Sequence, residues 1–151
     1  MAAKLITKAL ILLFSLASLI MLSNCSKEEP KLNIILRNKS LDTIKHYVQG
    51  MWHLRKVTGG ICSTCGSPVT ENPYMNIANE RILIGNDTGK KVDTIIVWKK
   101  TGYGMDSTYL LTYRTYKYYA FPINYVVDRI ENNNLILMDY ASDPFYYQYA
   151  K

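Results

Sequence analysis

Cysteines are the residues of this 151-residue sequence with the most evident chemistry, and two of the three form a Cys-x-x-Cys motif at Cys62 and Cys65. In redox proteins such a motif stands at a helix N-terminus after a strand, where the thiol pKa is lowered. Here glycines lie on both sides and no strand–helix–strand pattern surrounds the motif. We predict a structural disulfide in a loop, with unpaired thiols, redox activity and a metal site as alternatives.

Other catalytic chemistry has few candidates in the sequence. His46 and His53 are the two histidines, which excludes a three-histidine zinc site. If Trp52 lies in the core, His53 points outward, because adjacent residues of a strand face opposite sides. The acidic residues are scattered, and the sequence contains no nucleophile elbow, phosphate-binding loop or zinc-protease motif. We therefore expect a protein that is not an enzyme and has no cofactor or metal.

Residues 1–24 have the pattern of a secretory signal peptide. Lys4 and Lys8 precede an apolar run over residues 9–21, and polar and charged residues follow it. A membrane-spanning helix needs about 20 apolar residues, so a permanent N-terminal anchor is the less favoured alternative. Without this segment the chain has 16 basic and 12 acidic residues, and the scattered bases predict no nucleic-acid partner.

The end of the apolar segment, Leu22-Ser23-Asn24-Cys25, resembles a bacterial lipobox. The resemblance implies that Cys25 becomes a lipidated N-terminus, on which acyl chains such as palmitate anchor the protein to the outer membrane. Residues 26–30 resemble the short acidic export signal of Bacteroidota surface lipoproteins. That resemblance leaves both the cell surface and the inner leaflet of the outer membrane open. We expect residues 25–39 to be a tether and residues 40–151 to be the folded domain.

The rest of the sequence predicts one short helix followed by strands. Ser40 can cap a helix over residues 41–48, where apolar residues recur at helical spacing, and Gly50 ends it. Turn residues separate the strands at spacings of about 8–12 residues, which is typical of an all-β sandwich or barrel. The predicted strands cover residues 51–57, 74–84, 92–99, 107–119, 123–130, 135–140 and 145–150.

Three stretches of the chain resemble the lipocalin-like lipoproteins of Bacteroidota, and together the resemblance spans residues 41–151. The stretches are VQGMWHL at 48–54, the pair Gly59-Gly60 and NLILMDY at 134–140. The resemblance implies an all-β, antiparallel up-and-down barrel of about eight strands behind a short helix. Gly50 and Trp52 would form its G-x-W motif, with the tryptophan closing one end of the barrel and an arginine packed over it. Arg129 is the arginine nearest to the last strand.

The function implied by this resemblance is the binding or carriage of a small hydrophobic or amphipathic ligand. Eleven of the 13 tyrosines lie in the last 51 residues. The interior of a barrel of about eight strands can hold one small ligand or be filled by side chains. The alternative is a filled barrel whose exposed tyrosine-rich face contacts an envelope protein or a glycan. We expect any cavity to be lined from the strands at 92–99 and 107–119. The candidate contacts are Tyr109, Leu111, Tyr113, Tyr116 and Tyr118.

Overall fold

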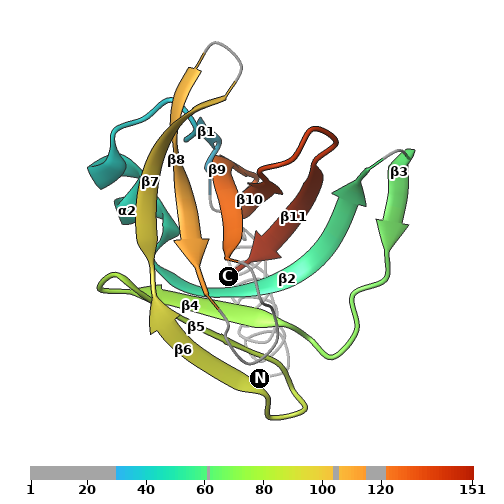
Figure 1. Cartoon of the computed structure of the whole chain (residues 1–151). Helices are drawn as coiled ribbons and strands as arrows, with labels where there is room; N and C mark the ends of the chain where they lie inside the picture. Colours follow the sequence, from blue (N-terminus) through green and yellow to red (C-terminus); the bar gives the residue numbers. More distant parts are fainter. Residues whose placement is uncertain (1–29, 61, 104–105, 115–121) are drawn as a thin grey trace, which may run out of the picture. The chain divides into compact units, whose positions relative to one another are not determined.

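An antiparallel β-barrel behind one short helix forms the fold, as the sequence predicts (Figure 1). The computed structural model describes residues 30–60, 62–103, 106–114 and 122–151, without the side chains of residues 62–67, 103 and 106. Residues 31–151 form one compact unit. The elements are β1 (Ile34–Ile35), α2 (Leu41–Val48), β2 (Gly50–Gly59), β3 (Cys62–Ser67), β4 (Tyr74–Ala78), β5 (Arg81–Gly85), β6 (Lys91–Ile95), β7 (Val97–Tyr103), β8 (Asp106–Tyr113), β9 (Ile123–Glu131), β10 (Asn134–Asp139) and β11 (Phe145–Ala150).

The strand order explains how the barrel nearly closes. Neighbouring strands follow the order β6-β5-β4-β2-β11-β10-β9-β8-β7, while β1 adds to β9 and β3 adds to β2. The two ends of this order, β6 and β7, are consecutive in the chain and are separated by Ile96 alone. One continuous segment therefore pairs with β5 through its first half and with β8 through its second half. This segment connects the two ends of the strand order and leaves the barrel nearly closed.

Two predicted strands are wrong in their extent. The predicted strand 74–84 is a hairpin of β4 and β5, whose turn residues Asn79 and Glu80 have φ of 48° and 63°. Tight hairpin turns of this kind favour Asn-Gly or Asp-Gly, so Asn-Glu gives little signal in the sequence. The predicted strand 92–99 is divided at Ile96, and its second half continues to Tyr103. Of the predicted strand 107–119, β8 accounts for the part up to Tyr113, and residues 115–119 lie outside the described residues.

The helix α2 begins and ends as its sequence indicates. The Ser40 side chain accepts a hydrogen bond from the Thr43 backbone N–H at 3.3 Å, which confirms the predicted cap. Ile44 and Val48 are fully buried, so one face of the helix packs into the core. The chain turns at Gly50, whose φ of +112° is one that residues with a side chain rarely adopt.

Trp52 joins the helix to the barrel. Its ring is 1% exposed, and its Nε1–H donates a hydrogen bond of 2.7 Å to the carbonyl oxygen of Val48. That carbonyl belongs to the last turn of α2, where carbonyl groups have no partner within the helix. The bond therefore satisfies a buried acceptor and holds α2 across one end of the barrel. Trp52 belongs to a buried core cluster that also includes Leu36, Ile44, Val48, Ile77, Ile82, Ile96, Ile130 and Leu135.

A lysine, and not an arginine, lies over the ring of Trp52. Lys151 Nζ is 5.0 Å from the ring centroid, a distance at which a cation–π interaction is favourable. Arg129 is bonded to the carboxylates of Asp128 and Glu131 instead. The residue that covers the tryptophan is therefore the last one in the sequence, immediately after β11.

The folded unit includes part of the segment that the sequence assigned to a tether ending at residue 39. Strand β1 pairs with β9, with Ile34 opposite Ile130, and Leu36 is fully buried. The backbone N–H groups of Leu36 and Arg37 donate to the carbonyl oxygen of Asp128 at 2.8 and 3.0 Å. Asp128 is itself 3% exposed, and Arg37 pairs with its carboxylate at 3.3 Å. Residues 34–37 therefore pack as part of the barrel.

The Cys-x-x-Cys motif lies on a strand rather than in the predicted loop. Strand β3 contains both cysteines and pairs with the end of β2, with Ser67 opposite Val57. The chain turns between β2 and β3 at Gly59, where φ is +120° and an added Cβ would lie 2.3 Å from the Pro144 oxygen. The side chains of Cys62 and Cys65 lie outside the described residues, so the disulfide stays a prediction.

We predict that Trp52→Phe destabilises the fold more than the same change at the half-buried Trp98. The first variant leaves the Val48 carbonyl buried without a donor, which costs about 1–3 kcal/mol beyond the lost packing. Urea unfolding followed by far-ultraviolet circular dichroism measures the unfolding free energy of both variants. Equal losses in the two variants would show that the hydrogen bond to α2 contributes nothing specific.

Candidate functional site

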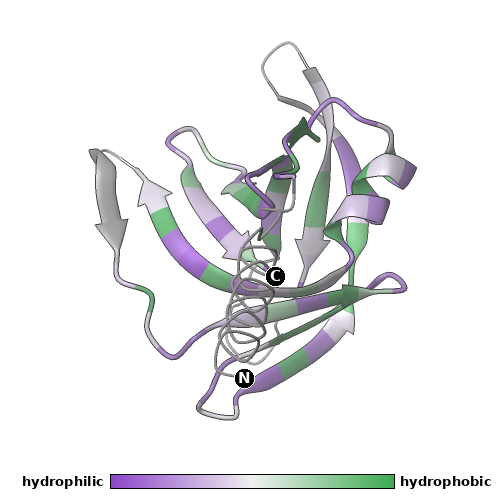
Figure 2. Cartoon of the chain, turned by 180° about the vertical axis from the view of Figure 1, so that it is seen from behind, coloured by the Kyte–Doolittle hydropathy of each residue, from purple (hydrophilic) through white to green (hydrophobic). Residues whose placement is uncertain are grey.

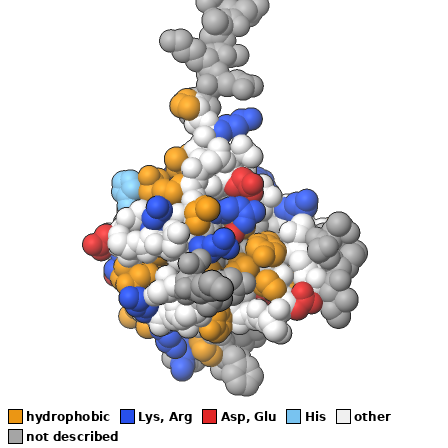
Figure 3. Space-filling model, turned by 90° about the horizontal axis from the view of Figure 1, so that it is seen from above, with side chains coloured by type: hydrophobic (Ala, Val, Ile, Leu, Met, Phe, Trp, Pro, Cys, Tyr) orange, Lys and Arg blue, Asp and Glu red, His pale blue; other side chains and the backbone are white. Residues whose placement is uncertain are grey.

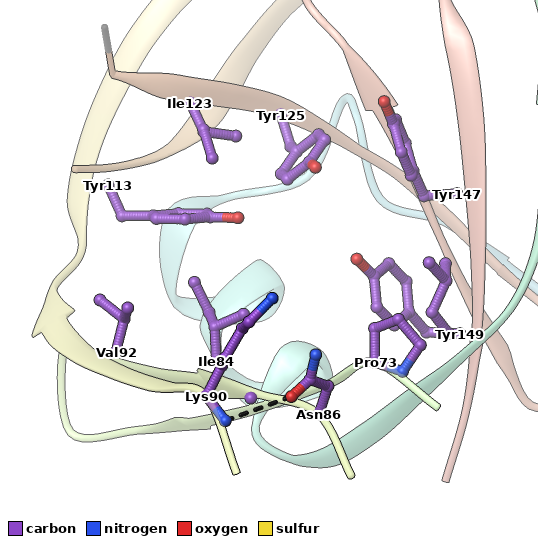
Figure 4. A pocket seen from close by; sticks show the side chains of 12 residues that line it. Pro73, Ile84, Asn86, Lys90, Val92, Tyr113, Ile123, Tyr125, Tyr147 and Tyr149 are labelled. Carbon is purple, nitrogen blue, oxygen red and sulfur yellow. Dashed lines mark hydrogen bonds between the residues drawn. The ribbon is translucent and has the colours of Figure 1, made fainter. Parts of the chain in front are cut away.

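A cavity of about 360 Å³ occupies the barrel beyond the end that α2 and Trp52 fill (Figure 4). It begins at Leu54, which is two residues after Trp52 on β2 and so lies on the same strand face. Small-molecule sites usually enclose about 300–1,000 Å³, so this space suits a small ligand. It is lined by Leu54, Pro73, Ile84, Gly85, Asn86, Lys90, Val92, Tyr113, Ile123, Tyr125, Tyr147 and Tyr149.

The two-residue period of the strands places the lining side chains. On β11, Tyr147 and Tyr149 face the interior, while Tyr146 packs with Leu110, Val126 and Met138 in a separate cluster. Figure 2 shows hydrophilic and hydrophobic residues mixed along the strands, as expected where the two faces have different surroundings. The register then places Tyr149 opposite Leu54 of β2 and Leu135 of β10. Tyr149 and Leu54 both line the cavity.

Tyrosine rings form one wall of the cavity. The rings of Tyr125 and Tyr147 meet edge to face, with centroids 5.1 Å apart and an interplanar angle of 65°. Tyr113 lies 6.3 Å from Tyr125 at 45°. These separations are in the range that favours aromatic pairs, so the rings brace one another. Figure 4 shows the hydroxyl groups of Tyr113 and Tyr149 directed toward the middle of the space, and that of Tyr147 directed away from it.

Burial keeps the hydroxyls of two lining tyrosines, Tyr125 and Tyr149, protonated. Desolvation, with smaller effects from neighbouring tyrosines, raises the pKa of Tyr125 well above its ordinary value. The same cause raises the pKa of Tyr149 beyond the range in which tyrosine normally ionises. Both side chains are therefore neutral hydrogen-bond donors at physiological pH, and the wall offers no negative charge to a ligand.

Aliphatic side chains and a short loop complete the cavity. Leu54, Ile84 and Val92 come from β2, β5 and β6. The loop between β5 and β6 is held by Asn86, whose Oδ1 accepts hydrogen bonds from Thr88 Oγ1 at 2.8 Å and from the Lys90 N–H at 3.3 Å. Figure 4 shows the Lys90 side chain extending from this loop toward the space that the tyrosines surround.

The sequence identified one of the lining tyrosines. Tyr113 lines the cavity, as predicted, and the predicted strand 92–99 contributes Val92. Leu111 is fully buried and Tyr109 packs against the core, but neither lines the cavity. Tyr116 and Tyr118 lie outside the described residues.

Three of the four lining tyrosines, Tyr125, Tyr147 and Tyr149, are not among the contacts predicted from the sequence. Tyr147 and Tyr149 have the spacing of residues on one strand face, which is the signal that could have revealed them. Tyr146 has the same side chain on the opposite face, so tyrosine content alone did not show which face is inside. The bulge between Gln148 and Tyr149 further obscures the register.

The two histidines are not among the residues that line the cavity. His46 is exposed on α2, and His53 lies on the face of β2 opposite to Trp52, with its ring 6.0 Å from that of Tyr74. Among the described side chains, no group of three or more His, Cys, Asp or Glu residues is arranged to hold a metal ion. The described part of the chain contains no helix with the length and apolar character needed to cross a membrane.

Charged side chains are distributed over the outside of the folded unit. Figure 3 shows lysines and arginines scattered among hydrophobic and neutral side chains on the face in view. Several acidic residues are paired with them, as in Lys45–Glu80 at 2.5 Å and Arg81–Asp93 at 3.0 Å. Such exposed pairs each contribute at most about 1 kcal/mol to stability.

We predict that Tyr149 makes the fold sensitive to alkaline pH. The pKa of Tyr149 is higher in the folded state than in the unfolded state, where it is about 10. The free energy of unfolding therefore keeps its full value below pH 10 and falls as the pH rises above 10. Between pH 8 and pH 10.5, the unfolding free energy of Tyr149→Phe should fall by about 0.8 kcal/mol less than that of the wild type. Urea unfolding at both pH values measures this difference. Tyr146→Phe is the control and should behave like the wild type, and equal losses in all three proteins would contradict the prediction.

Comparison with known proteins gives no relative for this chain. No family model matches it, and neither does any curated protein or solved structure. The function of the cavity is therefore inferred from its own residues.

Proposed function

We propose that this protein is a lipid-anchored envelope lipoprotein whose lipocalin-like barrel binds one small hydrophobic or amphipathic molecule without transforming it. The observation that carries the proposal is the cavity of about 360 Å³ between the tyrosine wall and the aliphatic side chains. A nearly closed barrel with one filled end and one hollow end is compatible with such a binding module.

The physical basis of binding is the burial of apolar surface in a preformed space. Each Å² of apolar ligand surface removed from water contributes about 25 cal/mol, and the braced tyrosine rings lose little freedom when a ligand enters. Tyrosine also combines a large apolar ring with a polar tip, which suits ligands that are apolar with a few polar groups.

The lining residues support a binding role rather than a catalytic one. The described residues that line the cavity include no histidine, cysteine or carboxylate. Tyr125 and Tyr149 have raised pKa values, which makes them poor bases and poor nucleophiles near neutral pH. Among the described lining residues, Lys90 is the one charged side chain, and a single cation without a partner base suits ligand recognition.

The location in the envelope rests on the N-terminal sequence. Residues 1–24 have the features of a signal peptide, and Cys25 follows them in a lipobox-like context. The folded unit begins at Lys31, and the chain between Cys25 and Lys31 can span at most about 20 Å. A lipid on Cys25 would therefore keep the barrel near the outer membrane, at the cell surface or on the periplasmic side.

The alternative from the sequence, a filled barrel that acts through an exposed tyrosine face, has less support. Tyr125, Tyr147 and Tyr149 face the interior and line the cavity. Tyr146 is on the outer face, but it is partly buried against Leu110, Val126 and Met138. Fewer tyrosines are thus available for a partner than the sequence indicates.

We predict that native mass spectrometry of the full chain, extracted in mild detergent from its own cells, shows a reproducible bound mass. Val92→Trp should abolish this mass, because the larger side chain fills the cavity. Val97→Trp is the matched control, since Val97 is 51% exposed and does not line the cavity. A bare wild-type protein, or a bound mass that survives in Val92→Trp, would contradict the proposal.

A further inference from the structure

We propose that the ligand is an organic anion, with an apolar body between the tyrosine wall and the aliphatic wall and a carboxylate between Lys90 and Tyr149. This inference rests on the proposed function, because it requires that the cavity binds a ligand. It adds the charge of the ligand and the orientation in which it enters.

The charges around the cavity favour a negative ligand. Of the described residues that line it, Lys90 carries a positive charge and none carries a negative one. Lys90 makes no salt bridge with a described residue, whereas the half-buried lysine of α2, Lys45, is paired with Glu80. The nearby carboxylate of Glu71 is bonded by Asn86 Nδ2 at 2.6 Å, outside the cavity lining. A ligand carboxylate would thus meet an ammonium group that has no competing carboxylate in the cavity.

The hydroxyl of Tyr149 is the second element of this recognition. Tyr149 is 9% exposed, and among the described residues no hydrogen-bond partner of its hydroxyl is found. The Tyr149 hydroxyl is not among the buried polar atoms that lack a partner, so it is accessible from the cavity, and a ligand acceptor would take the place of water there. Because burial raises the pKa of Tyr149, the hydroxyl stays protonated and donates to the ligand rather than accepting from it.

Both groups line the same cavity. Figure 4 shows the Lys90 side chain and the Tyr149 hydroxyl directed into the same space from the loop and from β11. The hydrogen bond of the Lys90 backbone to Asn86 fixes the start of the lysine side chain. A carboxylate has two oxygens, so one can meet the ammonium group while the other accepts from the hydroxyl. The body of the ligand would then lie against the rings of Tyr113 and Tyr125.

The test compares 2-naphthoate with 2-naphthamide, which have nearly the same shape but differ in charge. Isothermal titration calorimetry with the full chain in non-ionic detergent measures Kd, after the heat of partition into protein-free micelles is subtracted. We expect the wild type to bind naphthoate about tenfold more tightly than naphthamide, since hydrogen bonds to charged groups are the stronger ones.

Variants assign the preference to the two groups. Lys90→Met should weaken naphthoate binding about tenfold and leave naphthamide binding unchanged, because it removes the charge and keeps the apolar stem. Tyr149→Phe should weaken naphthoate binding about fivefold by removing one donor. Lys91→Met and Tyr146→Phe are the matched controls, because neither residue lines the cavity, and both should bind like the wild type.

The outcomes separate this inference from the proposed function. Equal affinity for the two probes, or no effect of Lys90→Met, would overturn the anion inference and leave binding in the cavity intact. Naphthoate binding that survives Val92→Trp would place the anion elsewhere and would also overturn it. Failure of both probes to bind would overturn the inference together with the proposed function.

Discussion

The hydrogen bond from the Trp52 indole to the Val48 carbonyl is the interaction on which the arrangement of the barrel depends. A helix of eight residues is too short to be stable alone, so α2 needs tertiary packing to form. The bond satisfies the last turn of α2 and fixes the helix across one end of the barrel, where Ile44 and Val48 complete the core. The lysine at the C-terminus, Lys151, then covers the outside of the same ring. One end of the barrel is thereby filled, and the remaining interior volume lies at the other end.

The hollow end follows from the residues that the strands bring there. Tyrosines are large, but in pairs they brace one another at ring separations of 5–6 Å and do not collapse into the space between the strands. The aliphatic residues opposite them, such as Ile84 and Val92, are too short to reach across. The cavity therefore results from the side chains that face inward on the far side of Leu54 from Trp52. The hydrogen-bond donors among them determine which molecules can bind.

Local sequence signals predicted much of the fold and little of the site. The Ser40 cap, the tryptophan after Gly50 and the turn residues between strands are short-range signals, and the structure has the helix and the barrel that they indicate. The Asn79-Glu80 turn has no glycine, so the hairpin that it makes was missed. Contacts between distant parts of the chain could not be predicted in this way, because no short-range sequence signal indicates that Leu36 contacts Asp128 or that Lys151 contacts Trp52. Alternation could not orient the last strand, since its two faces both carry tyrosine.

We claim that the barrel closed by Trp52 keeps a tyrosine-lined space that accepts a small molecule. A crystal structure of the protein grown with 2-naphthoate tests this claim most directly. We expect the naphthalene ring inside the barrel beside Tyr113 and Tyr125, with the carboxylate within hydrogen-bonding distance of Lys90. A structure in which side chains fill the interior, or in which naphthoate lies only on the outer surface, would contradict the account.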